Sequence, residues 1–185
     1  ADAKEDAAAQ VDAGSFFQVA CPSHTAPRDT TRGTRRAAPH CARRRRTAST
    51  RPSRARLSRV VPGFVVQFGL SPDPRENHRW ATRTLPDEPP LQDNRLGRVA
   101  LATSGPNSRS TQLYINMGDN RWLDGLRNEY LVPIGSVEDG MSVLSSLYGG
   151  YGDGVDQAQL AAGGETYATK AYPLLDRVLM AFPVE

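Results

Sequence analysis

The stretch Arg59-Val60-Val61-Pro62-Gly63-Phe64-Val65-Val66-Gln67 is the starting point for interpreting the fold of this chain. Two β-rich runs flank a Pro-Gly pair, which predicts two strands joined by a turn. Side chains alternate between the two faces of a strand, so Arg59, Val65 and Gln67 are expected on the same face. The stretch therefore predicts a sheet with one apolar face and one mixed face.

Further short strands follow, separated by turn residues. They are expected at Val99–Ala102, Gln112–Met117 and Val132–Val137, and one helix is expected at Glu138–Leu147 with Met141, Leu144 and Leu147 in the core. Residues 71–94 are rich in proline and charge, which is typical of a long loop. The pattern predicts a mainly β fold: a closed or nearly closed antiparallel barrel with one or two capping helices.

The charge divides the 185-residue chain into two parts. Residues 28–59 hold twelve arginines and one acid, which gives +11, and the formal net charge of +3 then leaves −8 for the rest. No large apolar residue occurs in 20–56, so this stretch cannot supply a face to a core. We therefore expect a lead and a disordered, basic low-complexity segment at 1–58, followed by one globular domain at 59–185.

Composition also excludes several classes of protein. No apolar run approaches the ~18 residues of a membrane span. Two cysteines, Cys21 and Cys41, are too few for a disulfide-rich scaffold. The first residue is alanine and no intact signal peptide is present, so a fragment or processed product is expected and no compartment is assigned.

Four motifs occur in the order typical of one family. They are 59–67, Leu101-Ala102-Thr103-Ser104-Gly105-Pro106-Asn107-Ser108, Ser110-Thr111-Gln112-Leu113-Tyr114-Ile115 and Trp122-Leu123-Asp124-Gly125. Over about 59–177 the chain resembles the cyclophilin-type peptidyl-prolyl cis-trans isomerases, in a bacterial-like branch. Residues 14–19 resemble the first strand of that family, whereas 28–58 lack its early hairpin and aromatic-rich helix.

The resemblance implies isomerisation of X–Pro bonds in protein folding, with proline-containing polypeptides as partners, no cofactor and no metal. By this resemblance, Arg59 is the catalytic hydrogen-bond donor, and the proline pocket is formed by Phe64, Val65, Tyr114 and Leu131. Gln67 and Gln112 orient Arg59 or the substrate, and the backbone of Ala102 and Thr103 binds the extended peptide. Trp122 lies at the edge of the pocket, at the position associated with cyclosporin binding. A monomer is expected.

Residue chemistry fits such a reaction. The amide rotates over a barrier of ~18–20 kcal/mol and no covalent bond is made, so neither a nucleophile nor a metal is required. The nitrogen regains a lone pair as the amide twists. A rigid, permanently charged donor such as arginine can then stabilise the twisted form more than the planar forms.

Alternatives remain for several of these residues. Periodicity alone favours plain core packing for Phe64 and Tyr114. Counting forward from Gly125 would put Arg127, instead of Leu131, at the pocket. We prefer Leu131 because the following strand fixes the register, and its side chain predicts weaker proline packing and reduced cyclosporin affinity.

Two other functions are compatible with the sequence. The first alternative is a barrel that binds Pro-containing peptides without useful turnover. A nucleic-acid binder acting through 28–58 is the second, although that segment lacks the aromatic residues that stack on bases. Cys21, His24, His40 and Cys41 are the right types for zinc, but their spacing is unusual for a zinc site.

Overall fold

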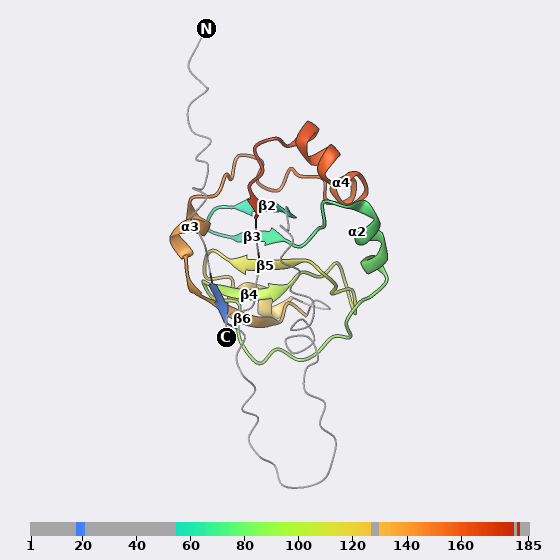
Figure 1. The fold of residues 1–185 in the computed structure, drawn as a ribbon. Coiled ribbons are helices and arrows are strands. Elements are labelled where there is room, and N and C mark those ends of the chain that lie inside the picture. The colour runs from blue at the N-terminus through green and yellow to red at the C-terminus, as the bar shows by residue number, and fades with distance from the viewer. Residues whose placement is uncertain (1–17, 21–54, 127–129, 180, 182–185) are drawn as a thin grey trace.

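Seven strands form one antiparallel sheet in the computed structural model, which describes residues 18–20, 55–126, 130–179 and 181. The strands are β1 (Gln18–Ala20), β2 (Ala55–Val61), β3 (Val65–Phe68), β4 (Arg98–Leu101), β5 (Leu113–Asn116), β6 (Pro133–Asp139) and β7 (Arg177–Val178). Their order is β1-β6-β4-β5-β3-β2-β7, and the sheet curls into a half-barrel (Figure 1). The predicted cyclophilin-like, mainly antiparallel β fold is confirmed.

The Pro62-Gly63 turn joins β2 and β3 as the sequence predicts. The Phe64 amide donates to the Val61 carbonyl at 3.0 Å, and Gly63 adopts a φ of 74°, which glycine tolerates at no steric cost. β2 begins at Ala55, before the domain boundary expected at 59, and Leu57 and Ser58 are already buried. The division of the chain into 1–58 and 59–185 stays a prediction.

One face of the sheet is apolar and forms the interior of the half-barrel. Two neighbouring clusters fill it: Leu57, Val60 and Val66 in one, and Val99, Ile115 and Leu144 in the other. Met141 and Leu147 pack against the second cluster. The predicted core role of the helix residues is therefore confirmed.

The helices differ from expectation in number as well as in bounds, since no helix was expected at 74–81, 121–125 or 157–171. The described helices are α2 (Pro74–Ala81), α3 (Met141–Ser145), α4 (Gln157–Ala171) and the 3-10 helix η2 (Arg121–Gly125). Expecting only loop at 71–94 was wrong, because the Asp73 side chain caps the Arg75 amide and Pro74 takes the first helical turn. The helix expected from Glu138 begins at Met141, since β6 extends through Asp139.

Helix α4 covers β2 at one end of the sheet and lies beside α2 (Figure 1). Arg56 on β2 is 5% exposed, and its guanidinium donates to both carboxylate oxygens of Glu165, at 2.7 and 3.2 Å. It also donates to the Leu175 carbonyl at 2.7 Å. An arginine of the basic segment thus anchors the C-terminal helix.

α4 contains one residue in a conformation that only glycine adopts readily. Gly164 has φ 56° and ψ −144°, and a Cβ there would lie 2.3 Å from the Pro72 carbonyl oxygen. This break lets the Glu165 amide donate to the same carbonyl at 3.0 Å. The helix therefore bends around the loop before α2.

Strand β1 pairs with β6 and overlaps the first strand expected at 14–19. In the part of the chain that the structure describes, no helix is long and apolar enough to cross a membrane. Cys21, His24, His40 and Cys41, as well as the arginine run at 43–46, lie outside the described residues.

Candidate functional site

A row of side chains crosses the outer face of the sheet. Arg59 on β2 lies opposite Gln67 on β3, Gln67 lies opposite Tyr114 on β5, and Tyr114 lies opposite Ala100 on β4. Directly paired residues in an antiparallel sheet point to the same face. The predicted mixed face is therefore present, on the side opposite the interior core.

A β-bulge at Ser58 brings Arg59 onto this face. Leu57 pairs with Phe68 and Arg59 pairs with Gln67, so Ser58 is the extra residue of β2. Without the bulge, Leu57 and Arg59 would share a face. The bulge lets Leu57 pack into the interior while Arg59 points outward.

Arg59 is held by two contacts. Its Nε donates to the carboxylate of Asp153 in an ion pair, and its guanidinium carbon lies 5.2 Å from the centre of the Phe64 ring. Phe64 in turn stacks on Trp122, with ring centres 5.6 Å apart and an angle of 20° between the planes. The charged group therefore lies against an aromatic surface, where a cation–π attraction adds to the ion pair.

An apolar cluster lies next to Arg59. Val65, Ala100, Tyr114 and Leu123 form its buried part, and Phe64, Ala102 and Leu131 pack against it. The structure thus brings together all four residues expected to wall a proline pocket, namely Phe64, Val65, Tyr114 and Leu131. Arg127 lies outside the described residues.

Trp122 stands at the edge of this cluster. It lies in the 3-10 helix η2, and its side chain is 59% exposed, whereas its neighbour Leu123 is buried. An indole that is exposed on one side and stacked on the other offers a surface to a ligand. Its role toward cyclosporin stays a prediction.

The two glutamines contact each other. Gln67 Nε2 donates to Gln112 Oε1 at 2.8 Å. In the described part of the chain, neither glutamine side chain makes a hydrogen bond to the Arg59 side chain. The backbone near them is also paired, since the Ala102 amide donates to the Gln112 carbonyl at 2.9 Å. This arrangement places the glutamines beside the Ala102-Thr103 strip, and the roles proposed for them stay predictions.

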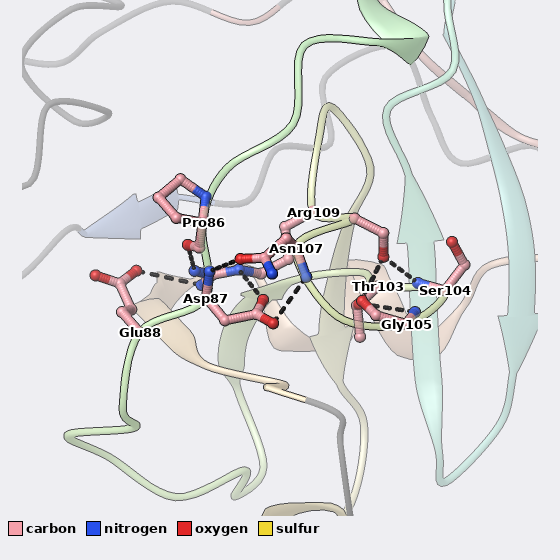
Figure 2. Close-up of polar contacts among 9 residues, drawn as sticks. Pro86, Asp87, Glu88, Thr103, Ser104, Gly105, Asn107 and Arg109 are labelled. Atoms are coloured by element: carbon pink, nitrogen blue, oxygen red, sulfur yellow. Dashed lines mark hydrogen bonds and ion pairs between the residues drawn. The ribbon is translucent and has the colours of Figure 1, made fainter.

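The turn that follows the strip is fixed by its own polar groups (Figure 2). The Thr103 hydroxyl donates to the Gly105 carbonyl at 2.6 Å and lies 2.8 Å from the hydroxyl of Ser108. The same turn is joined to the segment before it by two hydrogen bonds: the Asn107 amide donates to Asp87 Oδ2 at 2.7 Å, and the Asp87 amide donates to Asn107 Oδ1 at 2.9 Å. The turn therefore holds Thr103 in place.

Arg109 is the buried centre of the same turn. Its side chain is 1% exposed, and its guanidinium donates to the Pro86 carbonyl and, at 3.2 Å, to Glu88 (Figure 2). Its Nε lies 3.6 Å from Asp87 Oδ1, too far for a hydrogen bond. Hydrophobic periodicity could not identify this arginine, because Arg109 lies between secondary-structure elements.

A buried polar network lies behind the apolar cluster and was not predicted. Asn94 is its centre: its Oδ1 accepts from the Tyr114 hydroxyl at 2.8 Å, and its Nδ2 donates to Asp124 at 2.7 Å and to the Leu131 carbonyl at 2.8 Å. Asn116 adds a second donor to Asn94 Oδ1 at 3.1 Å. The network joins β5 to the segments that carry Trp122 and Leu131.

The network also determines the chemistry of Tyr114. Burial, followed by the negative charge of Asp124, raises the pKa of the Tyr114 hydroxyl above its ordinary value. The hydroxyl stays neutral and donates inward to Asn94. Tyr114 therefore contributes its apolar ring, and not its hydroxyl, to the cluster beside Arg59.

The family model for "Cyclophilin type peptidyl-prolyl cis-trans isomerase/CLD" matches residues 36–161, which include the whole row of site residues. The chain belongs to this cyclophilin family. The match begins inside the basic segment, so the family pattern extends further toward the N-terminus than the expected start at about 59. The bacterial-like branch stays a prediction.

The chain is also similar to curated proteins named as peptidyl-prolyl cis-trans isomerases. The chain is 34% identical over 97 residues to peptidyl-prolyl cis-trans isomerase CYP21-1 of Arabidopsis thaliana, covering 51% of this chain and 42% of that protein. It is 32% identical over 95 residues to peptidyl-prolyl cis-trans isomerase-like 1 of Aspergillus fumigatus, covering 48% and 55%. It is 33% identical over 95 residues to peptidyl-prolyl cis-trans isomerase ppi1 of Schizosaccharomyces pombe, covering 48% and 57%. The match spans about half the length of these relatives.

Proposed function

We propose that this cyclophilin catalyses cis–trans isomerisation of X–Pro bonds in polypeptides. One observation carries the proposal: the Arg59 guanidinium lies against Phe64, directly beside the apolar cluster of Val65, Tyr114 and Leu123. A proline ring packed on this cluster would bring its imide nitrogen toward the guanidinium. The donor would then favour the twisted amide, in which the nitrogen lone pair is free.

The remaining site residues hold the substrate in this proposal. The backbone of Ala102 and Thr103 pairs with the extended peptide, and Gln67 and Gln112 position it or Arg59. Leu131 closes the pocket with an aliphatic side chain, which packs on proline without an aromatic face. Cyclosporin binding at Trp122 is expected to be weaker than for family members with an aromatic residue at the position of Leu131.

A protease-coupled assay on an Ala-Pro peptide tests the activity. We expect catalysis by the full chain, and a loss of at least about tenfold in kcat/KM for Arg59→Ala, since about 1.4 kcal/mol of transition-state stabilisation corresponds to a factor of ten. Arg79→Ala is the matched control, because Arg79 is an exposed arginine of α2 whose ion pair within the described residues is with Glu76. Equal rates for Arg59→Ala and the unmodified chain would refute the proposal.

An NMR exchange experiment separates an enzyme from a binding module. The isomerase accelerates exchange between the cis and trans signals of the bound peptide. Saturable binding with no acceleration would make the chain a Pro-peptide-binding module. Salt-dependent binding of nucleic acid, lost on deletion of 43–46, would point to the basic segment instead. Sedimentation velocity tests the expected monomer.

A further inference from the structure

Among the described residues, Asp153 is the one that accepts a hydrogen bond from the Arg59 side chain. We propose that Asp153 is a positioning residue for Arg59, an inference that rests on the proposed isomerase function. The carboxylate takes the Nε–H edge of the guanidinium. Within the described residues, Nη1 and Nη2 make no hydrogen bond, so the outer edge of the donor is left for the substrate amide.

The loop that carries Asp153 is docked on β2 on both sides of Arg59. Gly152 forms a β-bridge with Val60, immediately after Arg59. Gln157 Nε2 donates to the Ser58 carbonyl at 2.7 Å, immediately before Arg59. Asp153 is therefore fixed between two points of attachment to the strand whose side chain it holds.

Internal contacts stiffen the same loop. The Gly152 amide donates to the Gly149 carbonyl at 3.0 Å, and the Gly154 amide donates to the Tyr151 carbonyl at 2.8 Å. The Tyr151 ring packs edge-on against Tyr148 and against another tyrosine, Tyr172, with ring centres 5.2 Å apart in each pair. The position of the Asp153 carboxylate is thus determined by the fold around it.

Arg59 needs such a partner because its other contacts do not fix its rotation. The Phe64 ring supports one face of the guanidinium but allows it to turn in its own plane. Gln67, its neighbour across the ladder, is bonded to Gln112. A donor acts on a transition state only when it is correctly oriented, and small misplacements are costly.

The pair should matter for turnover far more than for folding. Arg59 and Asp153 have side chains that are 31% and 64% exposed, and exposed ion pairs contribute little to stability. Substitution of Asp153 is therefore expected to lower kcat while leaving the unfolding midpoint unchanged. An effect confined to kcat is what loss of orientation in the transition state produces.

The experiment compares Asp153→Ala and Asp153→Glu in the full chain. We expect Asp153→Ala to lower kcat roughly three- to tenfold with KM nearly unchanged, and Asp153→Glu to recover part of that loss because the carboxylate is retained. Glu76→Gln is the control: it removes one negative charge from an exposed pair on α2 and leaves the site untouched.

A double-mutant cycle with Arg59 gives the decisive result. If Asp153 acts through Arg59, Asp153→Ala causes no further loss in an Arg59→Ala background. A full-strength second loss, or an Asp153→Ala variant with the unmodified rate, overturns the inference even when Arg59→Ala is impaired. A chain without any isomerase activity would instead refute the proposed function itself.

Discussion

Arg56 provides the sharpest test of how this fold is held together. The sequence places it in a basic, low-complexity stretch, whereas in the structure its side chain is 5% exposed. Within the described residues, this side chain makes four hydrogen bonds: two to Glu165, one to the Leu175 carbonyl and one, at 3.3 Å, to Thr169. We predict that Arg56→Ala destabilises the protein strongly.

The magnitude follows from what the substitution leaves behind. Removing one member of a buried ion pair costs about 3–5 kcal/mol, because the partner charge stays buried without compensation. Glu165 is 32% exposed, so water can solvate part of its carboxylate and lower the cost. We therefore expect a loss of ~2–4 kcal/mol in the free energy of unfolding.

Urea denaturation at neutral pH measures this loss. With a slope of about 2 kcal/mol/M, the midpoint should fall by about 1–2 M. Arg79→Ala removes an exposed arginine of α2 and should shift the midpoint by less than about 0.3 M. Equal shifts for the two variants would show that the contacts of Arg56 do not anchor α4, and the reasoning would fail.

Three further predictions concern stability. Tyr114→Phe should cost only about 1 kcal/mol by urea denaturation, because Asn94 Oδ1 keeps the donor of Asn116; a loss above ~3 kcal/mol would contradict this. Gly164→Ala should lower the free energy of unfolding by about 2–4 kcal/mol, because the new Cβ would clash with the Pro72 carbonyl oxygen and because alanine is strained at a positive φ. An unchanged urea midpoint would contradict this prediction. Hydrogen bonding to Arg56 lowers the pKa of Glu165 below its ordinary value of 4.5. The ionised carboxylate therefore contributes its full stabilisation above pH ~4.5, and this contribution is lost as the pH falls through the lower pKa of the folded state. Glu165→Gln should flatten the acid side of the profile of unfolding free energy against pH, and an unaltered profile would disprove this assignment.

The sequence predicted those parts of the fold that depend on short-range signals, namely the alternation of side chains along a strand and the residues of a turn. The run from Arg59 to Gln67 predicted the β2–β3 hairpin and the face shared by Arg59 and Gln67, because a Pro-Gly turn and a period of two are short-range signals. The residues expected to wall the proline pocket were assigned from the family motifs, because local pattern gave them no such role. Periodicity alone could not separate core packing from pocket for Phe64 and Tyr114.

Contacts between distant parts of the chain could not be predicted. Arg56 meets Glu165 and Arg59 meets Asp153 only after α4 and its preceding loop fold back on β2. The Asn94 network is equally hidden, because isolated polar residues near turns usually indicate solvent exposure. The bulge at Ser58 left no Gly or Pro in the strand to mark it.

The docking of the C-terminal segment on β2 has a consequence for the order of assembly. The Leu57 amide bonds to the Asp176 carbonyl at 2.9 Å, so this strand gains its outer neighbour from residues translated long after it. A nascent chain that ends before residue 149, ahead of the loop that carries Asp153, has the Arg59–Gln67 hairpin but neither the Arg56 anchor nor the Asp153 contact. The proposed isomerase activity should therefore appear late in synthesis, once this segment has left the ribosomal tunnel and closed over the hairpin.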